Sequence, residues 1–173
     1  MATQLDAATP AQRAPRTDSA RLYQEGIIAG TLGAAVIAFW FLIIDSLQGR
    51  PLYTPSVLGT ALFQGPAAVE SGTVSISLEM VVIFTWVHFL VFAFLGGIAS
   101  LLLGKAEESP NLGFGIVLFF VVFEFGFTAV AMTFAEPVLR ALAWPAVLVG
   151  NLLAAGTMGV YLWRRHPNLR IAP

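Results

Sequence analysis

Cysteine is absent from this sequence of 173 residues, and histidine and charged residues are scarce. Without cysteine the chain has no disulfides, no thiolate metal site and no thiol catalysis. The two histidines, His88 and His166, are too few for a metal centre built mainly from imidazoles, so no metal site is expected. Charged residues make up 11% of the chain, against about 25% in soluble domains, and the net charge is −1. No basic field suggests nucleic acid, which is therefore not an expected partner.

The deficit of charge is matched by an excess of apolar residues. Hydrophobic side chains make up 57% of the sequence, and the mean hydropathy is +0.80. A soluble chain of this length cannot bury so much apolar surface in one core, so membrane lipid is the expected surrounding. Four apolar runs, each at least about 20 residues and so long enough to cross a ~30 Å hydrocarbon core as helix, occupy 26–47, 78–103, 112–135 and 140–163. Because lipid offers no partner to peptide groups, these runs predict an all-α membrane protein, a bundle of four transmembrane helices.

Polar segments flank the predicted bundle at both ends of the chain. The sequence predicts a polar tail (residues 1–23), a four-helix transmembrane domain (24–164) and a short second tail (165–173). The first tail has almost no large apolar side chains, so alone it is expected to be flexible. The first apolar run reaches spanning length and ends without a small-residue cleavage site, so we interpret it as a span rather than a signal peptide.

Lysine and arginine residues flank the predicted spans unevenly. Seven lie on the side of the two termini and two on the opposite side. The first group is Arg13, Arg16, Arg21, Lys105, Arg164, Arg165 and Arg170, and the second is Arg50 and Arg140. Because cytoplasmic flanks carry the excess of basic residues, both termini are predicted to be cytoplasmic.

The predicted outer loop, residues 48–77, is the only long connection between spans. Within it, Thr54 and Pro55 have the pattern of a helix N-cap followed by proline at the first helical position. The segment 55–64 is mostly apolar and is followed by Gly65. It predicts a short helix, which either lies in the outer membrane interface or packs as an apolar lid over the bundle.

One part of this loop carries a family resemblance. The loop contains the fragment Gly49-Arg50-Pro51-Leu52-Tyr53-Thr54-Pro55, followed by Leu58-Gly59. It resembles a loop of small uncharacterised bacterial four-span membrane proteins, and the likeness covers about a quarter of the chain. The resemblance implies a bacterial inner membrane and a four-helix membrane fold, and it implies no activity.

Three polar side chains lie deep inside predicted spans, namely His88, Glu124 and Asn151. At ~1.5 Å per residue they are about 15, 18 and 16 Å from the first residue of their spans, so all three are expected near the membrane midplane. An ionised carboxylate that faces lipid costs at least ~2.5–3.5 kcal/mol. Glu124 should therefore face the bundle interior, where His88 is its natural partner.

This predicted intramembrane cluster has two interpretations. It is either a proton-accepting or substrate-binding site, or a hydrogen-bonded group that fixes helix packing. Thr85 and Thr128 extend a polar path if they face the cluster. The more common role of such threonines is a hydrogen bond to their own helix backbone.

His88 is also a candidate ligand for a cofactor. His166 lies beyond the inner end of the last span, so one chain cannot supply both axial ligands of a midplane haem. A single histidine can ligate a chlorophyll magnesium or pair with a histidine of another subunit. The expectation from the sequence alone is nevertheless that no cofactor is bound.

Small residues recur at helical spacing in the first span. Gly26, Gly30, Ala34 and Ala38 follow one another at intervals of four. Stripes of this kind let helix backbones approach closely. The stripe predicts a helix interface, either inside the bundle or with a helix of another protein.

No enzyme signature is present, so the chain is not expected to be an enzyme. There is no Gly-rich phosphate loop, no His-Glu-x-x-His and no nucleophile elbow. The leading hypothesis is a non-catalytic membrane subunit that stabilises or assembles a larger complex, such as a respiratory or photosynthetic one, with other subunits or further copies of itself as partners. One alternative is a small proton-coupled carrier or channel that uses His88 and Glu124. The other is a subunit that ligates a cofactor through His88.

Overall fold

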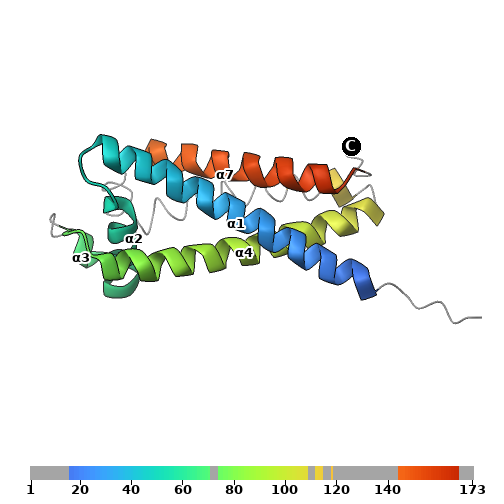
Figure 1. Ribbon diagram of the computed structural model, residues 1–173, viewed down its shortest axis with the longest axis horizontal. Coiled ribbons are helices and arrows are strands. Elements are labelled where there is room, and N and C mark those ends of the chain that lie inside the picture. The colour runs from blue at the N-terminus through green and yellow to red at the C-terminus, as the bar shows by residue number, and fades with distance from the viewer. Residues whose placement is uncertain (1–15, 71–73, 109–111, 115–117, 119–143, 168–173) are drawn as a thin grey trace, which may run out of the picture.

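The computed structural model describes residues 16–70, 74–108, 112–114, 118 and 144–167. These residues contain helices and no strands. Three helices are long and apolar enough to cross a membrane: α1 (Arg16–Leu47), α4 (Leu78–Glu108) and α7 (Trp144–Arg165). Two short helices, α2 (Tyr53–Gln64) and α3 (Ala67–Glu70), lie between α1 and α4 (Figure 1). The predicted span 112–135 lies outside the described residues, apart from 112–114 and 118.

The central helix of the described bundle is α1, and both α4 and α7 pack along it in the antiparallel direction (Figure 1). Four contacts fix this arrangement. Between α1 and α4, Leu22 lies beside Gly104 and Ala34 contacts His88. On the other side of α1, Glu25 faces His166 and Trp40 donates to the carbonyl of Ala146. The start of α1 therefore lies beside the ends of α4 and α7, and we call this the terminal end. The opposite end, which carries α2 and α3, is called the loop end.

The crossing of α1 and α4 is close because the facing residues are small. A Cβ atom added to Gly26 would lie 2.5 Å from the Cα atom of Gly97, and one added to Gly30 would collide with the backbone carbonyl of Phe92. Contacts this close leave room for hydrogen only, as in glycine-mediated helix pairs of membranes. The predicted small-residue interface is thus found inside the bundle, between α1 and α4.

The interface does not extend along the whole predicted stripe. Ala34 is fully buried, whereas Ala38 is exposed, so the close contact between α1 and α4 does not include Ala38. With 3.6 residues per turn, residues four apart are offset by about 40° around the helix axis. Three such steps turn Ala38 about 120° away from the face that begins at Gly26.

At the loop end, α1 stops in a left-handed glycine turn. Gly49 has a φ of 71°, a backbone conformation that glycine adopts without a Cβ clash. The amide of Arg50 donates to the carbonyl of Asp45 at 2.8 Å, and the amide of Gly49 donates to that of Ser46 at 3.0 Å. This pair of bonds is a Schellman motif, which satisfies carbonyls that the helix end leaves without partners. The predicted end of the first span at Leu47 is confirmed.

The start of α2 differs from the predicted cap. Leu52, with a φ of 68°, occupies the N-cap position and makes no side-chain cap bond, so the prediction that Thr54 is the N-cap is wrong. The cap is supplied from α1 instead. The carboxylate of Asp45 accepts from the backbone amide of Thr54 at 2.7 Å and from its hydroxyl at 2.8 Å. A carboxylate stabilises the free amides of a first helical turn, and local sequence does not reveal that it comes from another helix.

Helix α2 lies across the loop end and packs on the first turns of α4 (Figure 1). Its Val57 is fully buried in a small apolar core with Val69 of α3. Gly59 lets α2 approach α4 closely, since an added Cβ would lie 2.6 Å from the carbonyl oxygen of Met80. The buried face of α2 supports the lid interpretation, although Leu62 and Phe63 remain exposed on its other face.

Two of the predicted spans continue farther as helices at the terminal end. The helix α1 already begins at Arg16, inside the predicted polar tail, and α4 runs to Glu108 rather than ending at residue 103. An ion pair four residues apart, between Arg21 and Glu25 at 2.8 Å, supports the polar first turns of α1. Packing of helix on helix extends both elements beyond the hydrocarbon-length runs.

Candidate functional site

His88 lies in the middle of α4 and faces α1. Its Nε2 atom is 3.3 Å from the carbonyl oxygen of Ala34, a hydrogen bond in which Nε2 carries the proton, because a carbonyl oxygen accepts. The half-buried imidazole packs among the rings of Phe84, Phe89 and Phe92, and the nearest centroid, that of Phe92, is 4.7 Å away. This contact joins two helices in an aromatic surrounding.

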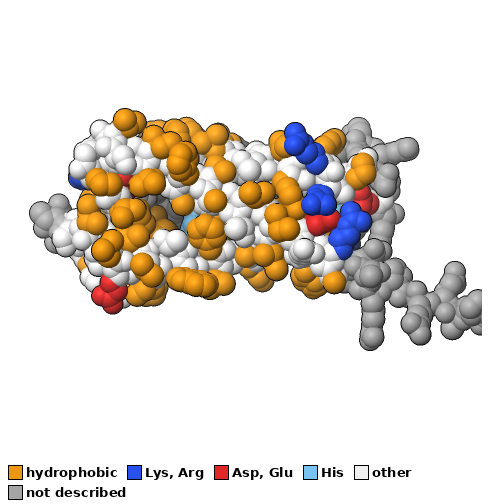
Figure 2. Space-filling model, viewed as in Figure 1, with side chains coloured by type: hydrophobic (Ala, Val, Ile, Leu, Met, Phe, Trp, Pro, Cys, Tyr) orange, Lys and Arg blue, Asp and Glu red, His pale blue; other side chains and the backbone are white. Residues whose placement is uncertain are grey.

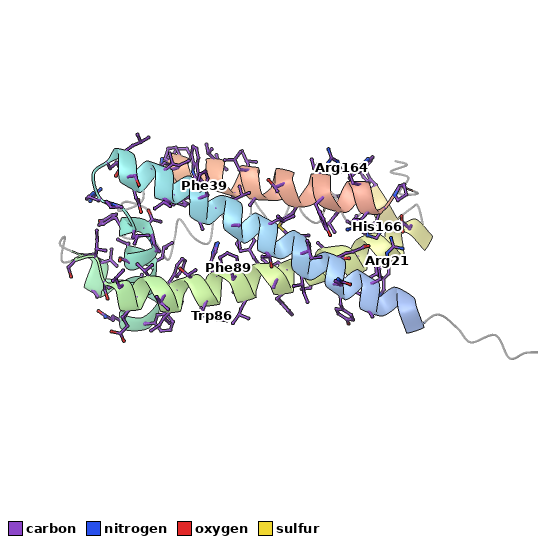
Figure 3. All side chains as sticks on the ribbon, in the orientation of Figure 1. Arg21, Phe39, Trp86, Phe89, Arg164 and His166 are labelled. Atoms are coloured by element: carbon purple, nitrogen blue, oxygen red, sulfur yellow. The ribbon has the colours of Figure 1, made fainter. Side chains whose placement is uncertain are left out.

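The surface is hollowed next to this histidine. Figure 2 shows the hollow on the loop-end side of the crossing of α1 and α4, with a histidine side chain at its edge. Figure 3 places His166 at the terminal end, so the side chain at the hollow is that of His88.

Among the described residues, no hydrogen bond joins His88 to Asn151. Asn151 lies on α7, and α4 and α7 pack along α1 rather than along each other. Its neighbour Gly150 faces Trp40 of α1, whereas His88 faces Ala34. Trp40 and Ala34 are six residues apart, which corresponds to about 9 Å along the axis of α1. Glu124 lies outside the described residues, so its pairing with His88 stays a prediction.

Thr85 takes the more common of its two predicted roles. Its hydroxyl donates to the carbonyl of Val81, one turn earlier in α4, at 2.6 Å. The hydroxyl proton is therefore used within the helix and does not extend a polar path from His88. Thr128, its predicted counterpart, lies outside the described residues.

A second polar group, not predicted from the sequence, lies at the terminal end. We call Arg21, Glu25, Glu107 and His166 the terminal-end cluster (Figure 3). The residues Glu25 and His166 are each only 4% exposed, although both are ionisable. The Nδ1 atom of His166 lies 3.0 Å from Oε2 of Glu107, and its Nε2 atom lies 3.7 Å from Oε2 of Glu25. Residues of α1 and α4 and the residue that follows α7 therefore meet in one polar cluster.

This cluster contains buried atoms without hydrogen-bond partners. They include Oε2 of Glu25 and Nε2 of His166, the two atoms that face each other at 3.7 Å. Buried polar atoms are rarely left unsatisfied, because the lost solvation costs about 1–3 kcal/mol. The side chains do not form a metal site, since no group of three or more His, Cys, Asp or Glu residues within the described part of the chain has suitable geometry.

Sequence reasoning missed this cluster for an identifiable reason. It placed His166 beyond the last span and ended the second span at residue 103, before Glu107. The available signal was the i, i+4 spacing of Arg21 and Glu25, which indicates a helix that continues past the lipid-length segment. Which side chains meet at its end depends on how the three helices pack.

Spanning-length apolar helices, a glycine-mediated crossing and polar contacts at both helix ends define a multi-pass α-helical membrane protein. No protein-family model, curated protein or solved structure matches this chain. The function therefore has to be argued from the residues themselves.

Proposed function

We propose that this chain is a non-catalytic integral membrane subunit that stabilises or assembles a larger membrane complex. The observation that carries the proposal is the use of polar side chains inside the described spans. Trp40 donates from Nε1 to the carbonyl of Ala146 at 2.9 Å, and His88 contacts the carbonyl of Ala34. Both bonds join one helix to another. Polar groups used in this way hold a scaffold together.

A fourth span completes the proposed scaffold. The helix α4 ends at the terminal end, whereas α7 begins at the loop end. The chain between Glu108 and Trp144 connects these opposite ends, and its apolar run 112–135 is long enough to cross a bilayer. These facts support a bundle of four transmembrane helices.

The proposed location is a bacterial inner membrane with both termini in the cytoplasm. Basic side chains gather at the terminal end, as Figure 2 illustrates, and include Lys105, Arg164 and Arg165. The loop end carries Arg50. This asymmetry follows the positive-inside rule, and the resemblance of the loop fragment supports a bacterial membrane.

Partner subunits have a suitable surface on α4. One side of α4 packs against α1, and the opposite side exposes an apolar stripe at intervals of four residues, formed by Val82, Trp86, Leu90 and Phe94. Trp86, which is 68% exposed, points away from α1 (Figure 3). A large aromatic surface of this kind contacts either lipid or the helix of a neighbouring subunit.

The proposal is tested by gentle purification of a tagged chain from its native membrane. We expect discrete partner subunits at fixed stoichiometry, and their loss when Trp86 and Phe94 are both changed to alanine without loss of the folded bundle. The matched control changes Leu152 and Val160, two exposed apolar residues of α7, and should leave the complex intact. A chain that purifies only with lipid or with copies of itself, with or without the changes on α4, contradicts the proposal.

A small proton-coupled carrier is a second candidate, favoured by the hollow beside His88. In proteoliposomes with an interior pH dye, the carrier hypothesis requires proton uptake that His88→Phe abolishes. The third hypothesis, cofactor ligation through His88, receives less support, because Nε2 of His88 is occupied by the carbonyl of Ala34. A visible absorption spectrum of the native complex that His88→Phe removes would favour this hypothesis.

A further inference from the structure

The terminal-end cluster has an incomplete contact at its centre. Oε2 of Glu25 and Nε2 of His166 face each other across 3.7 Å, and neither atom has a hydrogen-bond partner. The other polar atom of each side chain is engaged. Oε1 of Glu25 accepts from Nε of Arg21 at 2.8 Å, and Nδ1 of His166 lies 3.0 Å from Oε2 of Glu107. In each of the two side chains, one polar atom therefore has a partner and only the atom facing the other side chain has none.

The number of protons in the cluster explains why Oε2 of Glu25 and Nε2 of His166 lack hydrogen-bond partners. A neutral imidazole has a single N–H, and a carboxylate only accepts. When that N–H is on Nδ1, it donates to Glu107, and the lone pair of Nε2 then faces the lone pairs of Glu25. One additional proton, taken from solvent, adds to Nε2 or to Oε2 and forms a single hydrogen bond between them. No other group has to change its bonding.

The charges favour the same step. With a neutral imidazole, the positive charge of Arg21 and the negative charges of Glu25 and Glu107 sum to −1. Glu25 and His166 are buried, whereas the side chains of Arg21 and Glu107 are 64% and 26% exposed. A buried net charge is unfavourable, and the additional proton brings the sum to zero. The unsatisfied atoms and the excess negative charge are thus removed together.

We propose that Glu25 and His166 form a proton-binding site that ties the terminal ends of α1, α4 and α7 together. The bound proton draws the 3.7 Å contact towards the ~2.7–2.9 Å of a charge-assisted hydrogen bond. Because the cluster residues come from α1, from α4 and from the position that follows α7, proton binding tightens this end of the bundle and proton release loosens it. The site is separate from His88 and does not depend on the proposed subunit role.

The direction of the pH response follows from the groups that face His166. Among the described residues these are Glu25 from α1 and Glu107 from α4. Arg21 pairs with Glu25, and on α7 Arg165 lies over the ring of Tyr161. Imidazole is the side chain whose charge ordinarily changes between about pH 5 and 8. Because the added proton joins Glu25 of α1 to the residue that follows α7, the contact that it completes is expected to be present near pH 6 and lost towards pH 8.

The test compares thermal unfolding of the full chain in detergent at about pH 6 and about pH 8. We expect the unfolding midpoint to fall by about 2–4 °C towards the higher pH. Glu25→Gln supplies a permanent N–H to His166 and keeps an oxygen for Arg21, so its midpoint should be independent of pH. Glu79→Gln, at an exposed position in the first turn of α4, is the matched control and should keep the wild-type decline. An unchanged decline in Glu25→Gln, or none in the wild type, overturns the proposal.

A spectroscopic measurement covers the case in which Glu25→Gln fails to fold. In a His88→Phe background, His166 is the only histidine, so ¹⁵N-labelled histidine reports on this ring alone. We expect the Nε2 resonance of His166 to shift between about pH 5 and 8 as the proton is gained. An Nε2 resonance that stays at its unprotonated, unbonded position over this range contradicts a proton-binding site at Glu25 and His166.

Discussion

The two ends of the bundle hold their helices together by polar contacts that differ in completeness. At the loop end, Asp45 is only 2% exposed and accepts two short bonds from Thr54. At the terminal end, His166 makes one close contact with Glu107 and leaves Nε2 unsatisfied opposite Glu25. The first contact is complete, whereas the second leaves two facing atoms without partners, which is the gap that the proposed proton fills. A buried carboxylate is thus stable when its donors are backbone amides and hydroxyls, which do not titrate near neutral pH.

Both ends depend on the crossing of α1 and α4, so the largest effect is expected there. Gly30→Leu should prevent the native packing of the bundle, because a side chain has no space against the carbonyl of Phe92. Loss of cooperative thermal unfolding and a shift to aggregates on size exclusion would show this. Gly156→Leu is the control, since an added Cβ there meets no atom within 4 Å. Equal behaviour of the two variants would mean that the crossing does not limit folding.

The next largest effect is expected at the loop end. Asp45→Ala removes two charge-assisted hydrogen bonds and the cap of α2, which should cost about 2–3 kcal/mol of unfolding free energy. Thr54→Val removes only the hydroxyl bond and should cost about 1 kcal/mol. Denaturation at about pH 6 and about pH 8 should give the same loss at both values. A loss that depends on pH over this range would remove the contrast between the two ends.

A smaller effect is expected for the contact between Glu107 and His166. A double-mutant cycle with alanine at both positions should give a coupling of about 0.5–1 kcal/mol, since Glu107 is partly exposed and partly screened by solvent. The same cycle on Asp45 and Thr54 is the comparison. We expect the smaller coupling free energy at the terminal end. A larger coupling between Glu107 and His166 than between Asp45 and Thr54 would contradict this expectation.

The smallest effect is expected in the middle of the membrane. His88→Phe should change stability by less than about 1 kcal/mol, because the ring packs among phenylalanines and loses one bond to a carbonyl. If Glu124 pairs with His88, the single variant should instead be more harmful, and His88→Leu with Glu124→Leu should be less harmful than the sum of the two single changes. Additive single effects would show that the two residues do not touch.

Local sequence patterns determined where the membrane-spanning helices lie. The apolar runs predicted the end of α1 at Leu47 and the start of α4 at Leu78, because hydrophobic length and helical hydrogen bonding are properties of a continuous segment. The small residues Gly26, Gly30 and Ala34 predicted a close helix contact for the same reason. Such features are readable without knowing any partner.

Tertiary structure alone decided which polar groups meet. Asp45 caps a helix that begins eight residues later, and Glu25 meets a histidine that lies 141 positions away in the sequence. The rotation of α1 about its axis placed Ala34 in the interface and Ala38 outside it. The physical reason is that a hydrogen bond or an ion pair requires a separation of a few ångströms. Such separations are set by the packing, rotation and tilt of whole helices, which no single segment specifies.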